Sequence, residues 1–234
     1  MTDGWPESAD AWIASMGDGG DWSRIHVLDA PMLARVTLRP YAKALDVGCG
    51  EGRFCRMLRK RGIDAVGIDP TEAFIAVART RDPDGEYRQA GAEKLPFPDA
   101  SFDLVVSYLT LIDIPDYRAA LAEMTRVLKP GGALLIANLN SFISSSSGWI
   151  RSDDGRYAHY PVDNYLEERA TWVEWAGIRI HNWHRPLSAY MGALLGHGLQ
   201  LQYFDEPATQ SGDERQDRHN RAPWFVMMEW RKPG

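Results

Sequence analysis

The residues best placed to do chemistry form one glycine-rich stretch, residues 44–54. Three apolar residues and one acid, Asp46, are followed by glycines at every second position, Gly48, Gly50 and Gly52. Glycine allows positive φ angles and lets a ligand lie directly against the main chain. The pattern predicts a buried strand, a glycine turn and a helix whose free N–H groups face that ligand. Such a turn is typical of nucleotide binding.

The spacing of the glycines favours one kind of nucleotide. A dinucleotide turn has the pattern G-x-G-x-x-G, and its pyrophosphate lies on the helix N-terminus. Here the pattern is Asp-x-Gly-x-Gly-x-Gly, with Asp46 two residues before Gly48. A carboxylate at this point suits a cationic ligand group and repels a pyrophosphate. The spacing therefore argues against a dinucleotide-dependent oxidoreductase.

A second acid, Asp69, closes the next predicted strand, residues 65–68. An acid at the carboxyl end of the second strand of a Rossmann-like fold can accept hydrogen bonds from both ribose hydroxyls. The alternative is that Asp69 caps the helix predicted over residues 72–81. Its position at a strand end after a glycine turn favours the ribose role.

Three segments in order carry a family resemblance. They are the glycine turn, residues 91–103, which read Gly-Ala-Glu-Lys-Leu-Pro-Phe-Pro-Asp-Ala-Ser-Phe-Asp, and residues 128–132, which read Leu-Lys-Pro-Gly-Gly. Over residues 44–137 the chain resembles class I S-adenosylmethionine-dependent methyltransferases. The resemblance implies S-adenosylmethionine as the cofactor, with the glycine turn under its methionine part.

The resemblance also implies a set of cofactor contacts. Gly91 stands where the family often has an acid on the adenine amino group, so either Glu93 substitutes or Ala92 contributes its backbone alone. Ser107 ends an apolar strand whose carboxyl end should border cofactor and substrate. The expected cofactor-binding residues are Asp46, Gly48, Cys49, Gly50, Gly52, Asp69, Pro70, Ala92, Glu93 and Ser107.

The catalytic candidates are Asp113, His181 and His184, with His159 as a further possible base. Asp113 interrupts an apolar run and is either a general base, a substrate anchor or a cap before a turn. On one strand His181 and His184 point to opposite faces, so we expect no shared metal site. His184 could equally belong to a structural corner. A neutral amine acceptor needs no strong base, whereas a phenol or alcohol usually does.

The elements that position these residues follow from apolar periodicity. We expect helices over residues 23–36, 72–81, 116–128 and 187–195, and strands at residues 44–47, 65–68, 87–89, 102–107, 133–137, 199–204 and 224–230. Ile25 and Leu195 are among the residues expected to face inward. The predicted fold is α/β: a Rossmann-like, seven-stranded, mostly parallel sheet with an antiparallel last strand, helices on both faces and a lid insertion.

The chain is expected to be one domain, residues 1–234. Residues 1–40 should form a helical segment over the cofactor, in which Trp12, Trp22 or Arg24 lines the site or simply packs on the core. Residues 138–185 are too long for a plain connection and rich in aromatic residues, with extra strands expected within 172–183. With the polar loop 205–222 they are predicted to form a substrate lid.

Composition limits the partners. The formal charge is −6 and no run of Lys or Arg stands out, which argues against nucleic acid. We see no stretch as apolar as a membrane span and no signal-peptide core at the start, so we expect a cytoplasmic protein. The two cysteines suggest neither a disulfide nor a metal site.

The function predicted from these observations is methyl transfer from S-adenosylmethionine to a small-molecule acceptor, on a nitrogen or oxygen nucleophile, by in-line displacement. The alternative is a cofactor-binding regulator or assembly protein without methyl transfer. The strand end at residues 107–115 has no Asn-Pro-Pro-aromatic motif, which argues against nucleobase or glutamine amide methylation. Neither the acceptor nor the oligomeric state follows from the sequence.

Overall fold

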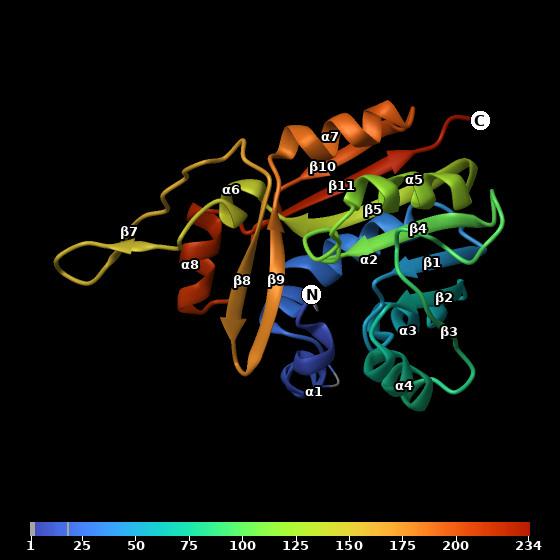
Figure 1. Cartoon of the computed structure of the whole chain (residues 1–234), viewed down its shortest axis with the longest axis horizontal. Helices are drawn as coiled ribbons and strands as arrows, with labels where there is room; N and C mark the ends of the chain where they lie inside the picture. Colours follow the sequence, from blue (N-terminus) through green and yellow to red (C-terminus); the bar gives the residue numbers. More distant parts are fainter. Residues whose placement is uncertain (1–2, 18) are drawn as a thin grey trace.

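The computed structural model describes residues 3–17 and 19–234 and contains a seven-stranded sheet (Figure 1). Its strands are β1 (Lys43–Val47), β2 (Asp64–Asp69), β3 (Glu86–Gln89), β4 (Phe102–Tyr108), β5 (Leu128–Leu139), β10 (Gln200–Asp205) and β11 (Phe225–Arg231). The order is β10-β11-β5-β4-β1-β2-β3. The neighbouring pairs from β5 to β3 are parallel, whereas β11 is antiparallel to both β5 and β10. The predicted fold is confirmed.

Helices cover both faces of this sheet (Figure 1). They are a π-helical turn η1 (Arg24–Leu28), α2 (Asp29–Thr37), α3 (Arg53–Arg59), α4 (Glu72–Arg81), α5 (Tyr117–Val127) and α7 (Leu187–Gly196). A further helix, α1 (Trp5–Met16), packs on α4. Alternation along the strands divides the core in two. Leu45 and Val105 pack with α5 and α7, while Ala44 and Leu104 pack with α2, α3 and α4.

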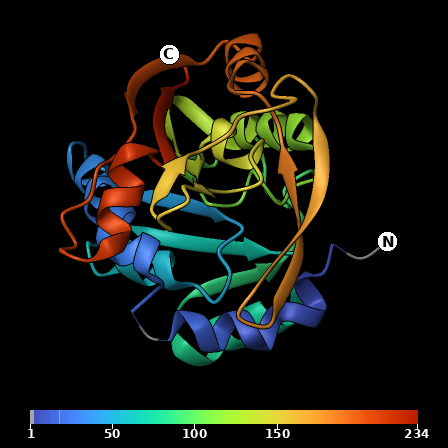
Figure 2. The same ribbon diagram turned by 90° about the vertical axis from the view of Figure 1, so that its left-hand side faces the viewer.

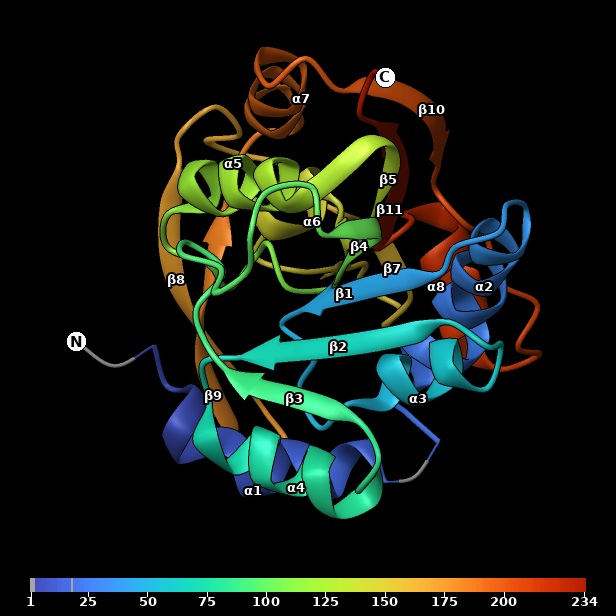
Figure 3. The ribbon, with the colours of Figure 1, turned by 90° about the vertical axis from the view of Figure 1, so that its right-hand side faces the viewer.

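The segment between β5 and α7 forms a separate layer. It contains α6 (Ser141–Ser144), β6 (Ile150–Arg151), β7 (Tyr157–His159), β8 (Arg169–Trp175) and β9 (Ile178–His184). The predicted extra strands are the antiparallel hairpin β8–β9. The hairpin reaches α1, against which β9 packs (Figure 2). The arrowheads of β1, β2 and β3 point toward the hairpin (Figure 3), so it lies at the carboxyl edge of the sheet.

Several local predictions were wrong. The helix expected over residues 23–36 is present, with the π-helical turn η1 leading directly into α2, but Ile25 faces outward with 48% of its surface exposed. Leu195 near the end of α7 is 57% exposed. The expected loop 205–222 contains a helix, α8 (Glu214–Arg221), because Asp213 caps it by accepting from the N–H groups of Arg215 and Gln216.

Among residues 3–17 and 19–234, no helix is long and apolar enough to cross a membrane.

Candidate active site

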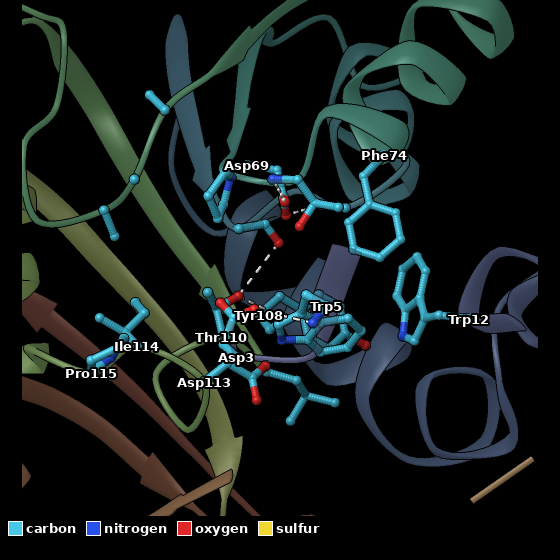
Figure 4. Close-up of a pocket in the computed structure, with 18 of the residues that line it drawn as sticks. Asp3, Trp5, Trp12, Asp69, Phe74, Tyr108, Thr110, Asp113, Ile114 and Pro115 are labelled. Atoms are coloured by element: carbon cyan, nitrogen blue, oxygen red, sulfur yellow. Dashed lines mark hydrogen bonds between the residues drawn. The ribbon is translucent and has the colours of Figure 1, made fainter. Parts of the chain in front are cut away.

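A cavity of about 280 Å³ opens at the carboxyl ends of β1, β2 and β4 (Figure 4). Four parts of the chain form its wall: the glycine turn after β1, the end of β2 with the start of α4, residues 90–93, and residues 108–115 after β4. The N-terminal segment adds Asp3, Trp5, Trp12 and Arg24. The position agrees with the rule that ligands of such sheets bind outside the carboxyl ends of the strands.

The glycine turn brings its backbone close to its neighbours. Gly48 and Gly50 have φ angles of +74° and +54°. A Cβ atom on Gly48 would lie 2.2 Å from Cγ2 of Thr110, and one on Gly50 would lie 2.8 Å from the Trp12 ring. Both positions therefore require glycine. The N–H groups of Gly48 and Cys49 donate to the Ile68 carbonyl at 2.8 Å, which fixes the turn to the end of β2.

Asp69 connects the glycine turn to the start of α4. Its Oδ2 accepts from the Gly50 N–H at 3.0 Å and its Oδ1 from the Thr71 N–H at 2.9 Å. Burial raises the pKa of this carboxyl to about 6, and the two N–H groups oppose the shift. The contact with the start of α4, which the alternative interpretation of Asp69 predicted, is therefore present. Each oxygen still has a lone pair that a ligand hydroxyl on the cavity side can use.

A smaller cavity of about 40 Å³ adjoins the first across Gly48 and Gly50, and Asp46 lines it. Oδ2 of Asp46 accepts from the Cys55 thiol at 3.6 Å, while the buried Oδ1 has no hydrogen-bond partner among the described residues. Burial raises the pKa of Asp46 to about 7. A buried carboxylate oxygen without a donor favours a site that a ligand completes.

Arg24 lines both cavities. Its guanidinium carbon lies 5.5 Å from the ring centre of Tyr108 and 5.8 Å from that of Trp12, and its Nη1 pairs with Asp21 at 2.5 Å. Above it, Trp5, Trp12 and Phe74 pack together with ring centres 4.8 to 6.1 Å apart. These rings, from α1 and α4, form one side of the cavity (Figure 4).

The loop after β4 closes the far end of the cavity. Leu109 takes a left-handed conformation with φ +57°, unusual for a residue with a Cβ atom. Asp113 lines the cavity, and its Oδ1 accepts from Nδ2 of Asn182 at 2.7 Å. The buried guanidinium of Arg185 donates to the carbonyls of Leu111, Ile114 and Pro115 at 2.6 to 2.9 Å. The β9 strand and the corner after it therefore hold this loop.

Residues 45–136 match a family model described as a methyltransferase domain. This part of the chain is therefore similar to a methyltransferase domain. Its fold is shared with an S-adenosylmethionine-dependent methyltransferase from Mesorhizobium loti, with a TM-score of 0.77 and 24% identity over 92% of this chain and 99% of that one. S-adenosylmethionine is the cofactor of these methyltransferases.

Curated relatives match over a similar region. Malonyl-[acyl-carrier protein] O-methyltransferase of Serratia marcescens is 35% identical over 130 residues, which cover 55% of this chain and 51% of that protein. Demethylmenaquinone methyltransferase of Renibacterium salmoninarum is 36% identical over 128 residues, covering 55% and 52%. The chain thus spans about half the length of the curated relatives it matches.

The site fits the charges of S-adenosylmethionine. Asp46, with its unpartnered oxygen beside the glycine turn, suits a cationic group, and Arg24 suits a carboxylate. Asp69 has the strand-end position that suits ribose hydroxyls. The glycine backbone between these side chains leaves no Cβ atom in the way.

The expected cofactor residues fall into two groups. Gly48, Gly50, Asp69, Pro70, Ala92 and Glu93 line the main cavity, and Asp46 and Cys49 line the smaller one. Gly52 instead lies under the Tyr87 ring, where a Cβ atom would come within 2.6 Å. Ser107 is fully buried inside β4. Gly52 and Ser107 line neither cavity, so packing accounts for both residues.

The histidines lie away from the cavity. His181 packs against Trp172 with ring centres 3.8 Å apart and the rings tilted by 41°. His184 is buried, its Nε2 donates to the Tyr165 carbonyl, and Ser144 Oγ lies 2.8 Å from its Nδ1; burial lowers its pKa. The structural corner therefore accounts for His184. His159 lies exposed on β7, and within the described residues no group of three or more His, Cys, Asp or Glu could hold a metal ion.

The sequence analysis missed three residues of the cavity wall, and it offered one residue as a site candidate that lies elsewhere. Asp3, Trp5 and Phe74 line the cavity, although no motif marks them. Trp22 was a candidate for the site, but it packs against Trp224, and its indole N–H donates to Asp213.

Proposed function

We propose that the chain transfers a methyl group from S-adenosylmethionine to a small-molecule acceptor, on a nitrogen or oxygen nucleophile, by in-line displacement. The observation that carries the proposal is the continuity of the cavity. One space joins the glycine turn and Asp69 to Asp113 in the loop after β4. Cofactor and acceptor can therefore meet in a single partly closed site.

The side chains of the site mainly bind and orient the cofactor and the acceptor. S-adenosylmethionine supplies a methyl group on a sulfonium, which is already a strong methyl donor. Asp69 would accept from the ribose hydroxyls, and Asp46 and Arg24 would balance the ammonium and carboxylate. Trp5 and Trp12 would exclude water from the reacting centre. Holding donor and acceptor in line replaces most of the need for acid–base catalysis.

Residues 1–40 and 138–185 are proposed to close the site in different ways. The N-terminal segment contributes side chains to the cavity wall itself. The 138–185 insertion supports that wall from behind, because His181 N–H donates to the Asp3 carbonyl and Asn182 donates to Asp113. As a lid, residues 138–185 would therefore hold the cavity wall in place.

The proposal is tested by calorimetric titration of the protein with S-adenosylmethionine, S-adenosylhomocysteine and NAD. We expect the two sulfur compounds to bind and NAD not to bind. Asp69→Ala should weaken binding at least about tenfold, since it removes two main-chain contacts and the ribose acceptor. Asp84→Ala, at an exposed turn position, is the control.

Binding of NAD alone, or of none of the three, would contradict the proposed cofactor site. Tight binding of the sulfur compounds without a methylated product from any acceptor tried would favour a cofactor-binding regulator.

A further inference from the structure

The cavity is unusually acidic for a site that must accept a second substrate. Among the described residues that line it, four carry carboxyl groups: Asp3, Asp69, Glu93 and Asp113. Arg24 is the one cationic side chain in the same set, and it is already paired with Asp21. S-adenosylmethionine carries one net positive charge, so the wall remains negative after the cofactor is bound.

Two of these acids, Asp3 and Asp113, are held by consecutive residues of β9. The His181 N–H donates to the Asp3 carbonyl at 2.9 Å, and Nδ2 of Asn182 donates to Oδ1 of Asp113 at 2.7 Å. The hairpin therefore brings an acid from the N-terminus and an acid from the loop after β4 to the same end of the cavity (Figure 4).

Arg24 acts on this pair of acids only from a distance, because no cationic side chain of the described residues forms an ion pair with either acid. Neither Asp3 nor Asp113 forms an ion pair with a Lys, Arg or His in residues 3–17 and 19–234. Like charges near each other in a partly buried wall are costly. The arrangement becomes favourable when a ligand brings a positive charge between them. Trp5 and Trp12 in the same wall offer ring faces, which also attract cations.

We propose that the methyl acceptor is a small amine, whose nitrogen is anchored by Asp113 with Asp3 beside it. The inference deepens the proposed function and rests on it. An anionic acceptor would meet repulsion at this wall, whereas an ammonium or amine gains a charge-assisted hydrogen bond.

Asp113 can also take up the proton that an amine must lose. Burial raises the pKa of this carboxyl well above its ordinary value. The Asn182 amide and the charge of Arg24 oppose the shift, and the charges of Asp3 and Asp69 add to it. Transfer of a proton from the bound ammonium to the carboxylate frees the nitrogen lone pair. That lone pair forms the nitrogen–carbon bond, while the carbon–sulfur bond breaks and leaves its electrons on sulfur.

The movement of positive charge during methyl transfer also favours an amine at the acidic wall of the cavity. During transfer to a neutral amine, positive charge leaves the sulfur and develops on the nitrogen, next to Asp113. Asp113 holds the transferred proton at this step, so the Asp3 carboxylate at the same end of the cavity stabilises the charge that develops. With a carboxylate or phenolate acceptor the charges would instead cancel, and the acidic wall would oppose binding.

The test compares three probes that share one skeleton: 2-phenylethylamine, 2-phenylethanol and phenylacetate. Each is titrated calorimetrically into protein saturated with S-adenosylhomocysteine, so that the acceptor end is measured without turnover. We expect the amine to bind at least about tenfold more tightly than the alcohol, and phenylacetate to bind most weakly. With S-adenosylmethionine, mass spectrometry should find the new methyl group on nitrogen.

Substitutions test whether Asp113 and Asp3 cause the preference for the amine over the alcohol. Asp113→Asn should reduce the amine's advantage over the alcohol to about twofold or less, and Asp3→Asn should reduce it by a smaller factor. Asp84→Asn, the same change at an exposed turn, should leave it unaltered. The affinity for S-adenosylhomocysteine should stay within about threefold in all three variants, which shows that they fold.

The inference is overturned if the alcohol or phenylacetate binds as tightly as the amine, if none of the probes binds, or if the preference survives in Asp113→Asn. Failure of the proposed function itself would give a different result, in which the wild-type protein does not bind S-adenosylhomocysteine or S-adenosylmethionine.

Discussion

The two ends of the cavity are built in different ways. The cofactor end consists of Gly48, Gly50, Asp69 and residues 90–93, which directly follow β1, β2 and β3. The acceptor end consists of residues 108–115 with Asp3 and Trp5, and β9 holds it through contacts between residues 69 or more positions apart. One end depends on local backbone geometry, and the other depends on tertiary contacts.

This difference predicts how the two ends tolerate change. Local turns form whenever their strands form, so damage at the cofactor end should affect ligand affinity with little loss of fold. The acceptor end depends on side chains that reach across the molecule, so damage there should reduce stability and acceptor binding together. Four predictions test this contrast.

The largest effect is expected from Gly48→Ala. The new Cβ atom would lie 2.2 Å from Thr110 in a residue with φ +74°, so backbone strain and a clash combine. We expect cofactor affinity to fall on the order of 100-fold, measured by calorimetry. Gly192→Ala in α7, where a Cβ atom meets nothing within 4 Å, is the matched control and should bind normally. Normal cofactor affinity in Gly48→Ala would show that the turn is not the binding element.

Arg185→Met tests the acceptor end. The change leaves the buried carbonyls of Leu111 and Ile114, and the partly buried carbonyl of Pro115, without their donor. The free energy of unfolding in urea should fall by about 2 to 3 kcal/mol, with weaker binding of the amine probe. Cofactor affinity should change less than in Gly48→Ala. If Arg185→Met instead affected only the cofactor, the division of the cavity into two ends would be wrong.

The pH dependence of cofactor binding should report on the carboxyls of the cofactor end. Burial raises the pKa of Asp46 to about 7 and that of Asp69 to about 6. The folded protein therefore holds extra protons between about pH 4 and pH 7, and unliganded stability falls as pH rises through that range. The cationic cofactor favours the ionised carboxylates, so its affinity should rise about tenfold or more from pH 5 and level off above about pH 7.

Calorimetry across this range gives the profile directly. Asp69→Asn should remove the lower part of the rise and leave the part near pH 7, which belongs to Asp46. A flat profile would mean that neither carboxyl contacts the cofactor.

The smallest effect is expected from Ser8→Ala, which tests the contact between α1 and the hairpin. Ser8 Oγ accepts from the Arg179 N–H at 2.9 Å and donates to the Arg179 carbonyl at 3.0 Å. Its loss should lower the free energy of unfolding by about 1 kcal/mol and loosen the acceptor end first. Ser15→Ala, at an exposed position of the same helix, should have almost no effect. Equal effects of the two changes would show that the contact does not hold the hairpin.

The sequence determined the sheet, the glycine turn and the acid at the end of β2, because each depends on residues close together in the chain. The spacing of Gly48 and Gly50 requires a left-handed turn, and the apolar runs of β1, β2 and β4 require burial on both sides. Helix α4 was predicted at its observed ends, since its apolar residues and boundaries lie within one short segment.

Only the tertiary structure decided the acceptor end. Asp3 and Trp5 carry no motif, and they reach the cavity because Ser8 and His181 fasten α1 to β9. Asp113 pairs with Asn182, and His184 is buried in the corner at the end of β9, only because the β8–β9 hairpin packs where it does. The apolar periodicity of a segment predicts which of its faces is buried, but it does not predict which distant segment packs on that face.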